Sequence, residues 1–142
     1  MLNLIETIQI RLVNQGCYHV HVHYVPQGVN MRLVIVESPF AAATPELHQE
    51  HIKYARACIK DALSRGEAPL ASHLLYTQEG ILDDTIPDER SWGINAGIAW
   101  YKVAEASVVY TDFGISKGMR YGIDRAILGG LTVEYRQIQT QE

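Results

Sequence analysis

The fold is decided by residues 31–66, which read MRLVIVESPFAAATPELHQEHIKYARACIKDALSRG. The short apolar run at 33–36 ends in a polar turn, a pattern typical of a strand that is buried on both faces. Thr44 and Pro45 then supply an N-cap and a proline at the first helical position, and apolar residues follow at helical spacing until Gly66. This stretch therefore predicts a buried strand followed by a long helix.

The rest of the chain continues the alternation of strands and helices. We expect a second strand at about 69–76 and, after an acidic loop, a helix at 87–104 with small residues along one stripe. A third strand is predicted at 108–111, a last helix at about 117–128 and a last strand at 131–136. This order predicts an α/β fold with a Rossmann-like open, mainly parallel sheet of about four core strands and flanking helices.

The N-terminal segment follows a different pattern. Apolar and polar residues alternate along 8–12 and again along 18–24, with turn-forming residues between the two runs. The alternation favours a β-hairpin, and a helix over residues 2–12 is the competing interpretation. We therefore expect a hairpin extension at 1–30 with a role in assembly, followed by an α/β domain at 31–142.

Composition excludes several classes of protein. The 142 residues are 47% hydrophobic, which is enough for one domain with a real core. The 12 basic and 16 acidic residues leave a net charge of −4 without a basic run, which argues against a nucleic-acid polymer as partner. Cys17 and Cys58 cannot make a disulfide framework, and the N-terminus carries an acid where a secretory signal carries Lys or Arg. We expect a cytoplasmic protein without a membrane partner.

Open α/β sheets bind ligands beyond the carboxyl ends of their strands, and residues 112–119, DFGISKGM, join a predicted strand to the last helix. The glycines permit close backbone approach, and free N–H groups at a helix start suit a phosphate or a sugar oxygen. We expect Asp112 to accept hydrogen bonds from ribose hydroxyls, with a turn-capping role as the alternative, and Phe113 to stack on a base. The spacing of Gly114 and Gly118 matches neither a GxGxxG motif nor a Walker A loop.

Other strand ends supply further candidates. Glu37 and Glu134 are acids that could act as a nucleophile or a general base, and the alternative for Glu134 is an ion pair with Arg136. His73 could hydrogen-bond a base or a sugar, and a structural role is the alternative.

We expect neither a metal nor a cofactor. The acids between 83 and 89 are typical of a solvated loop before a helix. His19, His21 and His23 alternate along one predicted strand, where such residues lie roughly 6.5 to 7 Å apart, too far to share one ion without other partners. Packing in the core or between subunits is the expected role of Trp92 and Trp100.

Four motifs occur together in this chain: ESPF at 37–40, HLLY at 73–76, an Arg, two Gly and a Trp spaced along 90–100, and DxGxSxGM at 112–119. Together they resemble the nucleoside 2-deoxyribosyltransferase-like superfamily, especially its small phage and bacterial branch. The resemblance covers about residues 31–136. It implies a Rossmann-like sheet, a pocket for a nucleoside or nucleotide, and a homo-oligomer in which neighbours complete each other's sites.

The resemblance also bears on catalysis. Active transferases carry a nucleophilic Glu directly after the Gly-Met pair, where this chain has Arg120. A guanidinium stays protonated and has no lone pair to offer, whereas it suits a phosphate. The strand ends and the resemblance together give these candidate ligand-binding residues: Ser38, Pro39, Phe40, His73, Asp112, Phe113, Gly114, Ser116, Gly118, Met119, Arg120 and Arg136.

These observations favour a protein that binds a nucleoside- or nucleotide-type small molecule without turning it over. The resemblance suggests a phage protein that sequesters a host nucleotide immune signal. The alternative is an N-glycosidic bond hydrolase or (deoxy)ribosyltransferase that uses Glu37 or Glu134 as a relocated carboxylate. A purely structural or protein-binding module is the third possibility.

Overall fold

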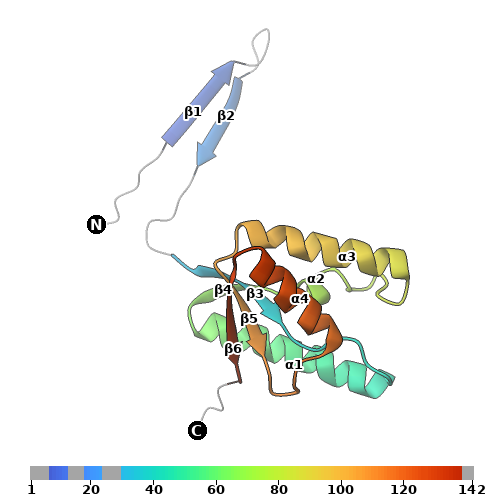
Figure 1. Cartoon of the computed structure of the whole chain (residues 1–142). Helices are drawn as coiled ribbons and strands as arrows, with labels where there is room; N and C mark the ends of the chain where they lie inside the picture. The colour runs from blue at the N-terminus through green and yellow to red at the C-terminus, as the bar shows by residue number, and fades with distance from the viewer. Residues whose placement is uncertain (1–6, 13–17, 24–29, 139–142) are drawn as a thin grey trace. The chain divides into compact units, whose positions relative to one another are not determined.

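The computed structural model describes residues 7–12, 18–23 and 30–138, and the chain divides into two compact units, Met1–Asn30 and Met31–Glu142. In the first unit, β1 (Thr7–Leu12) pairs antiparallel with β2 (Tyr18–His23) (Figure 1). The predicted hairpin is therefore confirmed, and the competing helix is wrong over the described strand β1.

The second unit is an α/β domain. Its elements are β3 (Arg32–Glu37), α1 (Pro45–Ser64), β4 (Glu67–Leu70), α2 (Ser72–Leu75), α3 (Pro87–Ala99), the 3₁₀ turn η1 (Trp100–Lys102), β5 (Ala106–Tyr110), α4 (Lys117–Leu128) and β6 (Thr132–Arg136). The four strands are all parallel in the order β4-β3-β5-β6 (Figure 1). This confirms the predicted open α/β sheet.

The two faces of the sheet carry different helices. Tyr54 and Cys58 of α1 pack with Val34 and Val108 on one face, so α1 covers that face. Met119 and Ile123 of α4 form a second buried cluster with Val109, which points the other way because neighbouring strand residues face opposite sides. Thr44 caps α1 as predicted, since its Oγ1 accepts a hydrogen bond from the N–H of Leu47 at 3.2 Å.

Strand order reverses at the centre of the sheet. The chain passes from β3 outward to β4, then crosses to β5 on the other side of β3 and continues to β6. A parallel sheet leaves a crevice at the carboxyl ends of the two strands where the order reverses, which here are β3 and β5. The topology thus places a candidate ligand site beside Glu37, the last residue of β3.

Two predicted elements are corrected. The strand expected at 69–76 ends at Leu70, and Ser72–Leu75 form the short helix α2. Short apolar runs do not distinguish a strand from a helix, and among the described strands β4 is an edge strand whose one partner is β3. The helix expected at 87–104 ends at Ala99 and gives way to η1. Within the described residues, no helix is long and apolar enough to cross a membrane.

Candidate functional site

A cavity of about 820 Å³ lies at the carboxyl end of β3, and we call it the switch-point cavity. Its wall combines the end of β3, the helix α2, one side of α3 and the first turns of α4. The lining residues on which the argument depends are Glu37, Ser38, Phe40, His73, Tyr76, Arg90, Gly97, Tyr101, Ser116, Lys117, Gly118, Met119, Tyr121 and Gly122.

Glu37 is the acid of this cavity. One of its carboxylate oxygens, Oε1, accepts a hydrogen bond from the Tyr101 hydroxyl at 3.0 Å. Burial raises the pKa of Glu37 to about 7, and the hydrogen bond from Tyr101 opposes part of that rise. The side chain has room because residue 122 is glycine: a Cβ there would lie 2.4 Å from Glu37 Oε1. Near neutral pH the cavity therefore holds a carboxyl group that can donate or accept a proton.

Ser38 and His73 form a pair beside this acid. Ser38 Oγ lies 2.8 Å from His73 Nε2, and the direction of the hydrogen bond depends on the tautomer of the ring. Burial lowers the pKa of His73 to about 4, so its imidazole is neutral at pH 7. The ring of Phe40 lies edge-on to His73 with ring centroids 5.8 Å apart. The pair lines the cavity as a neutral hydrogen-bonding group, and its internal contact also fits the structural role given as the alternative for His73.

The start of α4 forms another part of the wall. Ser116 caps the helix by accepting a hydrogen bond from the N–H of Met119 at 3.2 Å. Lys117 and Gly118 follow in the first turn and line the cavity. Of the predicted DxGxSxGM motif, the Ser, the second Gly and the Met thus reach the cavity, whereas Gly114 makes the preceding turn with a φ of 77°.

Asp112 lies elsewhere, which corrects its predicted role as a ligand for ribose. Its Oδ2 accepts hydrogen bonds from the Tyr54 hydroxyl at 2.5 Å and from the N–H of Ile138 at 3.2 Å. Phe113 is 55% exposed and lies against Tyr54, with ring centroids 4.6 Å apart. Neither residue lines the switch-point cavity. Asp112 instead makes a structural bond that fastens the strand end to α1, which differs from the turn-capping role given as the alternative.

Glu134 is also absent from the switch-point cavity. It pairs in register with Val108, which packs on α1, so it belongs to the face of the sheet opposite to Glu37. Arg32 and Arg136 both form ion pairs with Glu134 and lower its pKa to about 2. Arg136 also binds Glu67, with Nη1 2.6 Å from Oε2. Glu134 therefore forms the ion pair with Arg136 that was its alternative role, and neither residue lines the switch-point cavity where we predicted a nucleophile and a ligand.

Two other candidates do not reach the cavity. Arg120 is exposed on α4 and does not line it, and Pro39 is buried beside Ser38 without lining it. Arg120 therefore points to no phosphate site within the cavity.

Sequence reasoning missed the contribution of α3 and η1. Arg90 and Tyr101 line the cavity, and Gly97 lies so close to α2 that a Cβ would be 2.5 Å from Ser72 Oγ. The stripe of small residues on α3 was the available signal, but such a stripe is also typical of plain helix packing.

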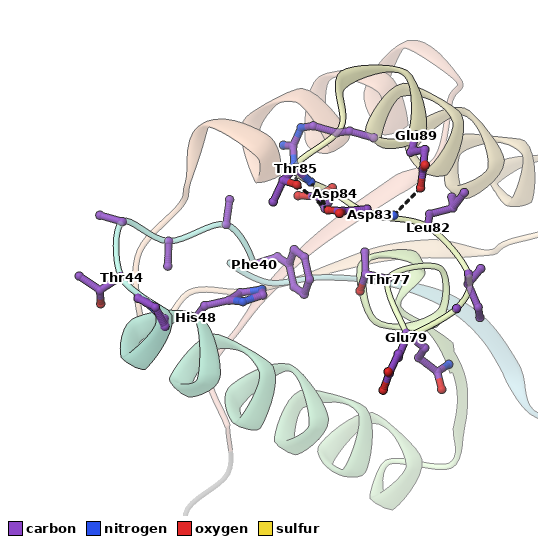
Figure 2. A pocket seen from close by; sticks show the side chains of 18 residues that line it. Phe40, Thr44, His48, Thr77, Glu79, Leu82, Asp83, Asp84, Thr85 and Glu89 are labelled. Carbon is purple, nitrogen blue, oxygen red and sulfur yellow. Dashed lines mark hydrogen bonds and ion pairs between the residues drawn. The ribbon is translucent and has the colours of Figure 1, made fainter.

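A second cavity of about 1040 Å³, which we call the loop cavity, lies between the turn after β3 and the loop before α3 (Figure 2). Residues 40–45 and His48 form one side, and residues 77–85 form the other. Oε2 of Glu89 accepts a hydrogen bond from the N–H of Asp83 at 2.6 Å, which holds the loop to α3. In the described part of the chain, no group of three or more His, Cys, Asp or Glu residues is arranged to hold a metal ion.

A family model described as a domain of unknown function (DUF7768) matches residues 32–136. The match runs from the first residue of β3 to the last residue of β6, so it includes every element that lines the two cavities and leaves out the hairpin. No curated protein matches the chain.

Proposed function

We propose that this chain, which belongs to the family described as a domain of unknown function (DUF7768), binds a nucleoside- or nucleotide-type small molecule in the switch-point cavity. The observation that carries the proposal is the convergence of Glu37 and the Ser38–His73 pair in one cavity where the strand order reverses. Cavities of roughly 300 to 1,000 Å³ with a few convergent polar groups are the usual sites for such molecules. The four motifs that resemble the deoxyribosyltransferase-like superfamily support the same ligand class.

Each part of a nucleotide finds matching chemistry in the wall. Glu37 suits a sugar hydroxyl, because its carboxyl group can accept a hydrogen bond and, when protonated, also donate one. The neutral His73 suits the polar edge of a base, and the ring of Tyr76 or Tyr121 suits its flat face. Lys117 and the N–H groups at the start of α4 suit a phosphate.

On this proposal the protein retains its ligand without converting it. Arg120 stands where the transferases have their nucleophile, and a guanidinium cannot attack an anomeric carbon. The resemblance to the phage branch suggests the setting that we propose, sequestration of a host nucleotide signal in the cytoplasm by a homo-oligomer.

Cleavage or transfer of an N-glycosidic bond is the second candidate function, and Glu37 is the observation that favours it. A carboxyl group with a pKa of about 7 is suited to protonate a leaving base or to activate a water molecule near neutral pH. Glu37 is the relocated carboxylate of this alternative, since Glu134 belongs to the other face of the sheet.

One experiment tests both functions. The protein is incubated with a panel of nucleosides and nucleotides, separated from the unbound compounds and denatured, and both the unbound fraction and the compounds released from the protein are analysed. We expect about one intact ligand per chain. Free base in either fraction would favour the catalytic alternative, and a panel recovered unbound and unaltered would reject both functions.

Two matched variants of α4 link that result to the cavity. Gly122→Ala places a Cβ against Glu37 and should reduce retention at least tenfold. Gly129→Ala, at the end of the same helix, meets only backbone oxygens at 3.4 Å or more and should leave retention unchanged. Equal retention by the two variants would remove the switch-point cavity as the binding site.

A further inference from the structure

We infer that the ligand has two ring-bearing moieties, each about the size of a nucleoside, and that one occupies the switch-point cavity while the other occupies the loop cavity. This inference rests on the proposed function and names the class of ligand that the site takes, a molecule of the dinucleoside type.

The two cavities are neighbours with a common wall. The residues that line both of them are Phe40, Ala41, Thr77, Leu82, Asp84, Glu89 and Arg90. These residues come from the turn after β3, the segment after α2 and the first turn of α3, so the common wall joins three parts of the chain. A ligand seated against Phe40 in one cavity therefore touches the border of the other.

The size of the cavities leaves room for two moieties. Sites for whole drug-sized molecules measure roughly 300 to 1,000 Å³. The switch-point cavity has about 820 Å³ and the loop cavity about 1040 Å³, so each alone has room for a molecule of nucleoside size. A mononucleoside would leave one of the two cavities without a ligand group.

Polar contacts within the common wall hold it in shape. Arg90 forms an ion pair with Asp84, while Glu89 holds the N–H of Asp83. A Cβ on Gly118 would lie 3.9 Å from Nη2 of Arg90, so the guanidinium also borders the start of α4. Arg90 therefore lies where the linker of a two-part ligand would cross, and its free N–H groups suit an acceptor on that linker.

The loop cavity is suited to a ring rather than to a phosphate. Phe40, Ala42 and Pro45 give it an apolar side, as Figure 2 shows for the labelled ring of Phe40. On the other side lie the carboxylates of Asp83 and Glu89 (Figure 2). Oε2 of Glu89 accepts from the N–H of Asp83 and Oδ1 of Asp83 accepts from Thr85, and the second oxygen of each carboxylate suits a donor on the edge of a ring. The second moiety is therefore a ring with hydrogen-bond donors.

Calorimetric titrations test this inference with four probes: AMP, GMP, diadenosine diphosphate and diguanosine diphosphate. For at least one base we expect the dinucleoside to bind ten times more tightly than the mononucleotide. Ala42→Phe fills the loop cavity, which Ala42 lines, and leaves the switch-point cavity, which it does not line, unchanged. It should lower the dinucleoside affinity to that of the mononucleotide and leave the mononucleotide affinity as it is.

Two further variants make the result decisive. Ala99→Phe adds the same ring at an exposed position of α3 outside both cavities and should change neither affinity. Ala43→Phe, at an exposed position of the loop cavity, should repeat the effect of Ala42→Phe if that variant folds poorly. Equal affinity for mononucleotides and dinucleosides, or an equal effect of Ala42→Phe on both, would overturn the inference while the proposed function stands. Failure of all four probes to bind the wild-type protein would overturn both.

Discussion

Glu37 and His73 share one cavity, and burial favours the neutral form of each. Their effects on stability have opposite signs. Between pH 4.5 and about 7, the folded protein keeps a proton on Glu37 that the unfolded chain has lost, so this group makes stability fall as the pH rises. Between about pH 4 and 6.5, the unfolded chain binds a proton on His73 that the folded protein does not, so this group makes stability rise with pH. The two effects largely cancel in the wild-type protein.

Glu37→Gln should expose this cancellation. The amide still accepts the hydrogen bond from Tyr101 but does not ionise. The variant therefore does not show the fall in unfolding free energy that Glu37 causes above pH 4.5. Relative to wild type, the variant should gain on the order of 3 kcal/mol of unfolding free energy between pH 4.5 and 7.5. Urea denaturation at several pH values measures the gain. His73→Gln is the control, because it should lose the rise in stability that His73 causes between about pH 4 and 6.5. A constant difference between Glu37→Gln and wild type would mean that Glu37 has an ordinary pKa.

Substitution of Asp112 should change the stability of the fold and leave ligand binding unchanged. Asp112→Ala removes the acceptor for the Tyr54 hydroxyl and for the N–H of Ile138, and should lower the unfolding free energy by about 1 to 3 kcal/mol. Retention of nucleotide should stay unchanged, because Asp112 does not line either cavity. Tyr54→Phe should cost less, and the double variant should be less destabilised than the sum of the two single variants. Loss of ligand without loss of stability would restore the ribose-binding role that the sequence suggested.

Among the elements, α4 was predictable from the sequence and α2 was not. A serine cap, amphipathic spacing and a glycine pair define α4 at both ends, and its bounds of 117–128 agree with the prediction. The segment after β4 has only a short apolar run, and such a run fits a strand and a helix equally well. The sequence therefore predicts a strand at His73, whereas the residue lies on α2 and lines the cavity.

The helix α3 packs closely on α2 at Gly97. A Cβ at position 97 would lie 2.5 Å from Ser72 Oγ and 2.8 Å from Ser72 Cβ, so Gly97→Ala should lower the unfolding free energy by about 1 to 3 kcal/mol. Gly93→Ala, one turn earlier, meets the flexible end of Leu82 at 3.3 Å and Tyr76 Cβ at 4.0 Å, and should cost much less. Urea denaturation of both variants checks the difference. Equal unfolding free energies of the two variants would mean that α2 can move away from α3 without a loss of stability.

At the scale of the whole molecule, the sequence predicted where a site would form better than which residues would build it. Strand order determines the crevice, and the alternation of strands and helices predicted a parallel sheet without its strand order, so four strand ends were candidate places for the site. Which side chains reach the crevice depends on the face of each strand, and a shift of one residue exchanges the faces. Glu37 and Glu134 illustrate this, because both are acids on predicted strands and they belong to opposite faces.

The division of the chain into two units predicts that the second unit folds and binds the ligand without the first. All the described elements of the core and of both cavities lie within residues 31–138, so a chain that begins at Met31 should keep the ligand affinity and the urea midpoint of the full chain. The register of the hairpin pairs Ile10 with Val20 and Gln9 with His21, so one face of this two-stranded sheet is apolar in sequence.

An isolated two-stranded sheet is marginally stable in water, and we therefore expect the hairpin to associate with other copies of the chain. Light scattering should give a larger particle for the full chain than for the chain from Met31, and Val20→Asp in the full chain should reduce it to the smaller size. Equal particle sizes would remove assembly as the role of the hairpin, whereas a loss of ligand affinity in the shorter chain would show that the binding site needs the first unit.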